Sequence, residues 1–290
     1  MSTSSHTPSH TSSQEGPSVA DLIRTAQDRL SPAELKLSRV LLAHYPAAGL
    51  ESSHALAQRA NVSAPTVLRF LTRLGFAGYR DFQGTLRAEV QARRASPLTL
   101  PARITAGSPT SELAGIVAET ATNGIRLTFQ TLAEHEFERA VSLISDPAHR
   151  ITCFGGRFSH LLATYLDRHL RLLRPRTRVH TPHPNDDPSF LVDLGRRDVC
   201  VAFDVRRYQD TTITLARAAA DRGAKVILVT DPWLSPIADI AGVVLSARVE
   251  AGGSFDSLVA PTALTEALIA AVHARLGSAA DERMRTIEDV

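Results

Sequence analysis

The chain of 290 residues has little cysteine, lysine or tryptophan and no long apolar run. Its only cysteines, Cys153 and Cys200, cannot form a disulfide framework, and each lies in a short apolar segment. Buried, reduced thiols are therefore expected, with a redox pair on neighbouring strands as the alternative. No stretch reaches the ~18 apolar residues that a membrane helix needs. These absences exclude a disulfide-rich scaffold and predict a cytoplasmic protein with no membrane partner.

Charge is distributed unevenly, although the net charge is only +2. Residues 18–94 contain 11 Lys and Arg against 6 Asp and Glu, a net +5, which leaves −3 for the remainder. A basic module joined to a nearly neutral one is typical of a DNA reader with a sensor. The first 17 residues are polar and lack the apolar core of a signal peptide, so we expect a disordered tail.

Residues 53–76, SHALAQRANVSAPTVLRFLTRLGF, predict a helix, a short turn and a second helix. Ala57 is small where two helices would cross closely. Asn61 stands at the turn, where the backbone often needs a left-handed residue. Ser63 suits the N-cap of the second helix, and Gly75 suits its end. This layout is the helix-turn-helix, in which the second helix enters the major groove of DNA.

The second of these helices has one apolar face and one polar face. The polar face includes two arginines four residues apart, and Arg can bind phosphate or read guanine. A merely solvated helix face is the alternative. The expected DNA contacts are Ala64, Pro65, Thr66 and Arg69 near base edges and Ser63 and Arg73 near phosphates, the partner being a double-stranded operator.

The rest of the chain divides into helical and alternating regions. Helical periodicity also predicts helices at 18–29, 32–44 and 80–94, so the amino-terminal part is all-α. We expect the following organisation: a disordered tail 1–17, a helix-turn-helix domain 18–94, a Pro-rich linker 95–110, an effector-binding and dimerisation domain 111–277, and a carboxyl-terminal tail 278–290.

Beyond residue 150, short β-branched runs alternate with helical patterns. Five strands are expected, at 151–154, 177–181, 199–203, 225–230 and 243–246. Helices at 159–173, 210–222 and 257–276 lie between or after them, while 111–133 and 135–145 precede them. This pattern predicts a doubly wound parallel α/β sheet whose ligands bind at the carboxyl ends of the strands. In the common order 2-1-3-4-5, the first and third strands flank the ligand site.

The chain resembles the RpiR/MurR family of bacterial transcription regulators, which join a helix-turn-helix domain to a SIS (sugar isomerase) domain. The residues that carry the resemblance are Leu56-Ala57, Val62-Ser63, Thr66-Val67, Arg69-Phe70, Leu74-Gly75-Phe76, Gly78-Tyr79, Phe82, Gly155-Gly156, Ser159, Thr230-Asp231 and Ser235-Pro236-Ile237-Ala238. The resemblance implies a regulator that binds DNA and a sugar phosphate. It departs after the third strand, where the family's hydroxyl-rich phosphate loop is replaced by DVRRYQDT at 204–211.

The arginines in the loops after the first and third strands point to a small anionic effector, either a sugar phosphate or an organic acid. The alternative is that they pair with Asp204, Asp210 or Asp231 and hold loops or a dimer interface together. The expected effector-binding residues are Gly155, Gly156, Arg157, Ser159, Asp204, Arg206, Arg207 and Ser254.

No catalytic residue, metal site or cofactor is predicted. His180, His183, Asp186 and Asp187 form the only metal-like cluster, in a Pro-rich loop that we interpret as surface. We predict a one-component regulator that forms a homodimer or tetramer. Two alternatives stay open: a sugar-phosphate isomerase, for which Glu250 or Glu266 could supply a general base, and a regulator whose sheet domain only dimerises.

Overall fold

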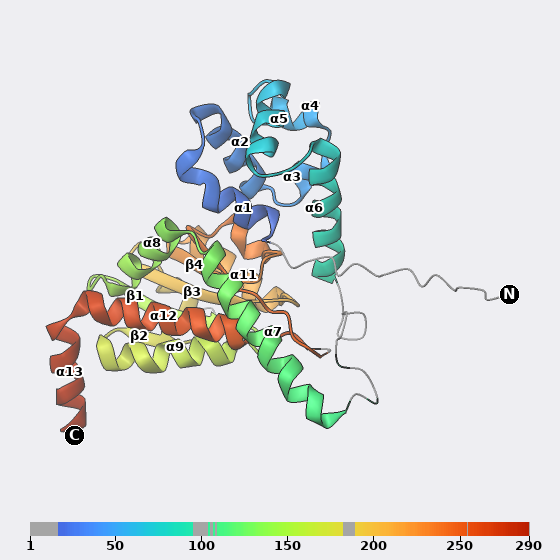
Figure 1. Cartoon of the computed structure of the whole chain (residues 1–290). Helices are drawn as coiled ribbons and strands as arrows, with labels where there is room; N and C mark the ends of the chain where they lie inside the picture. The colour runs from blue at the N-terminus through green and yellow to red at the C-terminus, as the bar shows by residue number, and fades with distance from the viewer. Residues whose placement is uncertain are drawn as a thin grey trace.

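The structure, a computed structural model, consists of a helical part stacked on an α/β part (Figure 1). It describes residues 17–94, 104, 107, 109–181, 189–253 and 255–289. Residues 1–16 of the predicted tail and most of the predicted linker therefore lie outside the described residues. Within those ranges, no helix is long and apolar enough to cross a membrane.

The helical part begins with two capped helices. Its elements are α1 (Val19–Ala26), a 3-10 turn (Gln27–Arg29), α2 (Pro32–Ala43), α3 (Ala47–Leu50), α4 (Ser53–Arg59), α5 (Ala64–Arg73) and α6 (Tyr79–Arg94). Ser31 caps α2, and the carboxylate of Glu34 accepts a hydrogen bond from the backbone N–H of Ser31, so the two residues form a capping box. Short α3 was not among the predicted helices.

Helices α4 and α5 form the predicted helix-turn-helix. Asn61 has φ 51° and Gly75 has φ 94°, so both turns use the left-handed conformation that the sequence predicted. Ala57 is buried where the helices meet, and the side chains of Val67 and Phe70 are fully buried. The apolar face of α5 therefore anchors the helix and leaves its opposite face exposed.

Gly49 in α3 packs directly against α6. A Cβ built there would lie 2.9 Å from Phe82 Cζ and would also clash with Leu86. We expect Gly49→Ala to lower the free energy of unfolding by about 1–3 kcal/mol, because this core has no room for a methyl group. Urea denaturation measures the loss. Gly84→Ala on α6 is the control: its Cβ meets nothing within 4 Å, so unchanged or slightly higher stability is expected.

The α/β part is built on a five-stranded parallel sheet in the order β2-β1-β3-β4-β5. The strands are β1 (Arg150–Gly155), β2 (Thr177–Val179), β3 (Asp198–Asp204), β4 (Lys225–Thr230) and β5 (Val243–Ser246). This confirms the predicted fold class and strand order. In register, Gly155 of β1 pairs with Phe203 of β3, so the loops after these two strands leave the sheet side by side.

Helices cover both faces of the sheet. The helical elements are α7 (Thr110–Thr131), α8 (Glu134–Ser145), α9 (His160–Leu173), α10 (Ser189–Val192), α11 (Asp210–Asp221), the 3-10 helix η2 (Pro236–Asp239), α12 (Val259–Leu276) and α13 (Ser278–Glu288). Side chains of α8, α9 and α12 fill one core, and those of α11 and η2 fill the other. The predicted tail 278–290 thus contains a helix, which contacts α9.

Helix α7 buries little of its length. Only Gly124 and Thr128 are buried among its 22 residues, while Val117 and Phe129 are 50% and 40% exposed. In Figure 1 its amino-terminal half extends away from the body of the molecule.

The two parts contact each other through α1, α2 and the turn that follows α2. Ala20 belongs to the core on the α11 side of the sheet, and Leu42 and Tyr45 pack against that core. At the edge of the sheet, the hydroxyl of Ser246 donates a hydrogen bond of 2.5 Å to Asp21. The helix-turn-helix part is therefore seated on the α/β part through both apolar and polar contacts.

Candidate functional site

The amino-terminal end of α5 is a capped, exposed helix start. Ser63 Oγ accepts a hydrogen bond of 3.3 Å from the Thr66 N–H and lies 2.8 Å from Thr66 Oγ1. Ser63, Ala64 and Pro65 are exposed, whereas Thr66 is buried. The end that docking helices usually present to DNA is thus open to solvent.

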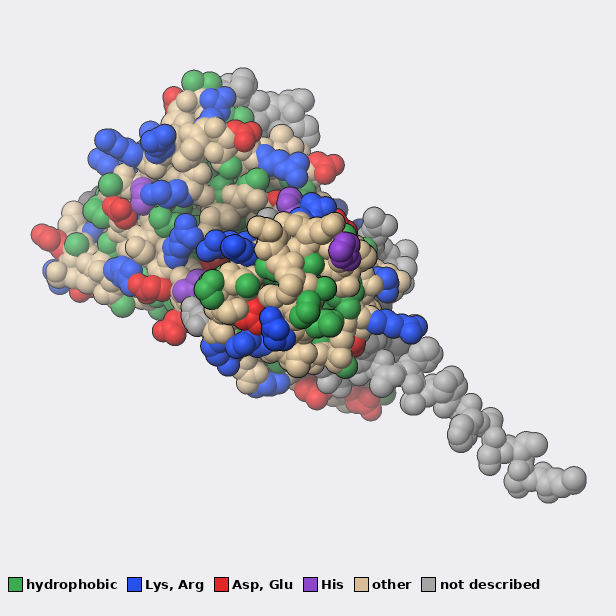
Figure 2. Space-filling view, turned by 90° about the horizontal axis from the view of Figure 1, so that it is seen from above, with side chains coloured by type: hydrophobic (Ala, Val, Ile, Leu, Met, Phe, Trp, Pro, Cys, Tyr) green, Lys and Arg blue, Asp and Glu red, His purple; other side chains and the backbone are tan. Residues whose placement is uncertain are grey.

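The two arginines of α5 have different surroundings. Arg69 is exposed and donates a hydrogen bond of 3.2 Å to Thr66 Oγ1. Arg73 pairs with Glu34 of α2 at 3.2 Å and donates to the Arg29 carbonyl at 3.1 Å. Arg69 is therefore available to a ligand, while Arg73 also ties α5 to α2. Figure 2 looks onto this end of the molecule and shows basic side chains at several places, with fewer acidic ones between them.

A cavity of about 660 Å³ lies where the β1 and β3 strands end. Its residues come from three loops: Gly156, Arg157, Phe158 and Ser159 after β1; Asp204, Val205, Arg206, Arg207, Tyr208 and Gln209 after β3; and Phe255, Asp256 and Leu258 before α12. Six of the predicted effector-binding residues line it. Gly155 does not, and Ser254 lies outside the described residues.

Two of the lining side chains hold the loops together. Ser159 Oγ accepts from the Gly156 N–H at 3.0 Å and donates to the Phe203 carbonyl at 2.7 Å, which joins the β1 and β3 loops. The buried Asp204 accepts a hydrogen bond of 2.5 Å from the Ser235 hydroxyl. Gly155 serves the same packing, because a Cβ there would lie 2.8 Å from the Ser159 carbonyl carbon.

Arg206 is held on three sides. Its guanidinium pairs with Asp256 and lies 4.0 Å from the centre of the Trp233 ring, and its side chain is 3% exposed. Its backbone N–H donates to Asp231 at 2.6 Å. The alternative in which the arginines stabilise loops therefore describes Arg206, although its partners include Asp256 and Trp233, which the sequence did not suggest.

Asp231 fixes the conformation of the loop that follows β3 through three hydrogen bonds. Its carboxylate accepts from the hydroxyl of Tyr208 at 2.7 Å and from the N–H of Trp233 at 3.0 Å, besides the N–H of Arg206. Burial raises the pKa of Asp231 to about 6, and the hydrogen bonds from Tyr208 and Arg206 oppose that rise.

Arg157 and Arg207 are the exposed cations of this cavity. Within the described part of the chain neither makes an ion pair, and Arg157 contacts only the ring of Phe158, at 5.3 Å. The lining also exposes Phe158 and Phe255, at 59% and 73%. Sequence reasoning missed both phenylalanines, because an isolated aromatic in a loop carries no periodic signal.

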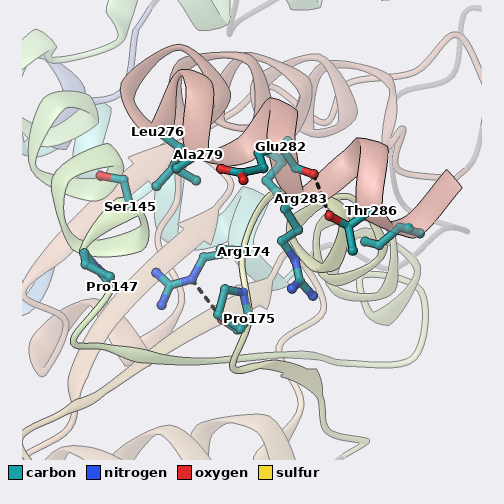
Figure 3. Close-up of a pocket in the computed structure, with 11 residues that line it drawn as sticks. Ser145, Pro147, Arg174, Pro175, Leu276, Ala279, Glu282, Arg283 and Thr286 are labelled. Carbon is teal, nitrogen blue, oxygen red and sulfur yellow. Dashed lines mark hydrogen bonds between the residues drawn. The ribbon is translucent and has the colours of Figure 1, made fainter. Parts of the chain in front are cut away.

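A second cavity, of about 450 Å³, lies between α13 and the loops that precede β1 and β2 (Figure 3). Arg174 and Arg283 reach it but are already bonded. Arg174 donates to the Ile144, Asp146 and Pro175 carbonyls, and Arg283 donates to the Arg171 carbonyl at 3.0 Å. These bonds give its arginines a structural role in holding α13 and two loops.

The remaining candidates carry no site chemistry. His180 stacks on Phe190 with ring centres 4.1 Å apart, while His183, Asp186 and Asp187 lie outside the described residues. Among the residues that are described, no group of three His, Cys, Asp or Glu could hold a metal ion. Cys153 and Cys200 are buried and unbonded, and burial raises the pKa of Cys200 to about 12, which makes it unreactive.

Comparison with known proteins assigns both parts of the chain. Residues 18–93 match the helix-turn-helix domain of the rpiR family, and residues 144–271 match the SIS domain. The chain thus combines an RpiR-type helix-turn-helix domain with a SIS domain. It is 28% identical over 233 residues to the bifunctional protein glk of Paraburkholderia xenovorans, covering 78% of the chain and 35% of that protein. It thus spans about a third of the length of such relatives.

Solved structures agree with this assignment. The sugar isomerase domain of an RpiR transcription factor from Sphaerobacter thermophilus has 28% identity and a TM-score of 0.58, covering 62% of this chain and 99% of that one. The NanR protein of Vibrio vulnificus, solved with ManNAc-6P, has 18% identity and a TM-score of 0.52, covering 93% and 96%. The second likeness concerns the fold.

Proposed function

We propose that this protein is a regulator of the RpiR type, which binds operator DNA through α5 and whose cavity binds a small anionic effector that changes operator affinity. The observation that carries the sensor half is the pair of exposed cations, Arg157 and Arg207, at the carboxyl ends of β1 and β3, neither of which pairs with an acidic group among the described residues. In parallel sheets, ligands bind at this position. The family assignment and the open start of α5 support the DNA half. A role on the chromosome implies a cytoplasmic protein.

Operator binding rests on Arg69. We expect Arg69→Ala to weaken binding by about 1–3 kcal/mol if its guanidinium reads a base edge. Fluorescence anisotropy with an operator obtained by selecting bound genomic fragments measures the loss. Arg126→Ala on α7 removes the same charge and should leave affinity unchanged, because Arg126 bonds only with Asn123 and Gln130 on its own helix. Equal affinities for the wild type and Arg69→Ala would contradict the assignment.

The cavity is connected to the DNA-binding part by a short route. Asp204 lines the cavity and bonds to Ser235, which is the N-cap of η2. In turn, η2 contacts α2, which Arg73 ties to α5. An effector that moves Asp204 would therefore favour one position of α2, and only such differential binding shifts an equilibrium. Operator binding measured with and without small anions tests this regulation.

The isomerase alternative needs Glu250 or Glu266 as a general base at the cavity. Neither residue lines the cavity. Glu250 pairs with Arg248 at 3.0 Å, and Glu266 accepts a hydrogen bond of 3.1 Å from the Tyr165 hydroxyl on the far side of α12. Detection of sugar-phosphate turnover without operator binding would reverse this choice.

The proposal includes a homodimer, or a tetramer built from dimers. It is supported by α7, because a helix that exposes Val117 and Phe129 has apolar surface left for a second copy. A dimer would also place two α5 helices for the two halves of an operator. Sedimentation of the full chain tests the oligomeric state.

A further inference from the structure

Most polar side chains around the β1–β3 cavity already form hydrogen bonds or ion pairs with other residues of the protein. Ser159 bridges two loops, Tyr208 donates to Asp231, and Arg206 pairs with Asp256. A polyhydroxylated ligand needs a partner for each hydroxyl, since an unpaired polar group that loses water costs about 1–3 kcal/mol. Among the described lining residues, three side chains form no hydrogen bond or ion pair with other described residues and could serve: Arg157, Arg207 and Gln209.

Apolar side chains line the cavity at positions where the hydroxyl groups of a sugar ligand would need polar partners. Phe158 and Phe255 are more than half exposed, and both line the cavity together with Val205 and Leu258. A buried aromatic side chain removes roughly 150–250 Å² of surface from water, and a ring that stays exposed lacks the stabilisation that this burial provides. Rings at 59% and 73% exposure beside one cavity therefore favour a ligand with an apolar body.

The charge of the cavity sets the charge of its ligand. The side chains that line it include three arginines, Arg157, Arg206 and Arg207, and two aspartates, Asp204 and Asp256, so the lining itself has a formal charge of +1. A carboxylate of charge −1 neutralises it. A phosphate monoester carries about −1.5 to −2 at pH 7 and would leave negative charge in excess.

Resting on the proposed sensor function, we infer that the cavity takes a monocarboxylate with an apolar or aromatic body. Arg157 and Arg207 bind the carboxylate, with Arg207 presented by a loop that Asp231 and Asp256 hold rigid through Arg206. Phe158 and Phe255 cover the apolar body. This ligand class differs from the sugar phosphates that the domain resemblance implies.

Trp233 supplies a reporter for the experiment. It is the only tryptophan of the chain, and its ring stacks on Arg206 at the cavity. Quenching or shift of its emission can be followed while the full chain is titrated with phenylacetate, hexanoate, glucose 6-phosphate and inorganic phosphate. Phenylacetamide, which has the same body without the charge, is the matched neutral probe.

Both carboxylates are expected to give saturable changes with at least tenfold higher affinity than phenylacetamide or glucose 6-phosphate. The double variant Phe158→Ala/Phe255→Ala should lose at least tenfold in affinity for phenylacetate, and Arg157→Ala/Arg207→Ala should abolish binding. Leu172→Ala on α9, an exposed apolar side chain that does not line the cavity, is the control and should bind as the wild type does.

The outcomes separate this inference from the function on which it rests. Binding of glucose 6-phosphate in preference to the carboxylates would overturn the inference and leave an anion sensor intact. Carboxylate binding that survives loss of both phenylalanines would also overturn it. No response to any of the anions, with operator binding retained, would overturn the sensor function as well.

Discussion

Replacing Arg206 with alanine is expected to lower the free energy of unfolding by about 3 kcal/mol, because it breaks a buried ion pair and leaves one charge without its partner. The guanidinium is 3% exposed, pairs with Asp256 and stacks on Trp233. Asp256 itself is 18% exposed, so its desolvation is incomplete, and the lower end of the range for buried pairs applies.

Urea denaturation of the full chain measures this effect, and the next residue provides the control. Arg207 is exposed, so Arg207→Ala should change stability by no more than about 0.5 kcal/mol. Arg206→Lys keeps the charge and loses the planar stack on Trp233, so an intermediate loss is expected. Equal stability of the Arg206→Ala and Arg207→Ala variants would contradict a structural role for Arg206.

The stability of the protein is expected to fall as the pH rises from about 5 to 8, and Glu89 is expected to supply a large share of the change. Glu89 is 5% exposed on α6. It accepts hydrogen bonds from the Tyr45 hydroxyl and, at 2.9 Å, from the Val19 N–H. Burial, with the nearby charge of Asp21, raises the pKa of Glu89 to about 7, while these hydrogen bonds and Arg248 oppose the rise.

The sign follows from proton uptake. The folded state holds a proton on Glu89 up to about pH 7, while the unfolded chain releases it near the ordinary value of 4.5. The stabilisation is fully present below the unfolded pKa and is lost as the pH rises through about 7. Across that window the loss amounts to about 3 kcal/mol, on the order of 1.4 kcal/mol per pKa unit.

Thermal denaturation between pH 5 and 8 checks this for the wild type and for Glu89→Gln, which keeps the acceptor for the Val19 N–H. The variant should show a weaker pH dependence. Asp231, with a pKa raised to about 6, titrates in the same direction, so Asp231→Asn measures its separate share. Identical pH profiles for the wild type and Glu89→Gln would contradict the prediction.

The structural features that could be predicted from the sequence are those that depend on residues close to one another along the chain. The N-cap Ser63 and the left-handed Asn61 are local features, and the structure confirms both of them. The parallel sheet followed from the alternation of strands with helices, and its strand order was expected because it is a common one for such sheets. Short α3 escaped, because four residues are too few for helical periodicity to show.

The roles of Arg206 and Arg207 could not be predicted in the same way. The two residues are adjacent and chemically alike, yet one is buried and the other exposed. The difference arises from Trp233 and Asp256, which lie 27 and 50 positions farther along the chain. Which members of the effector-binding set contact a ligand stays a prediction.

The hydrogen bond between Asp204 and Ser235 has a thermodynamic consequence. If a ligand in the cavity changes operator affinity by some factor through η2 and α2, linkage requires that operator DNA change the affinity for that ligand by the same factor. A titration of the cavity in the presence of saturating operator would then report by its sign how the ligand acts on DNA binding: weaker ligand binding marks a ligand that lowers operator affinity, and tighter binding marks one that raises it. The factor by which the ligand changes operator affinity must equal the factor by which the operator changes ligand affinity.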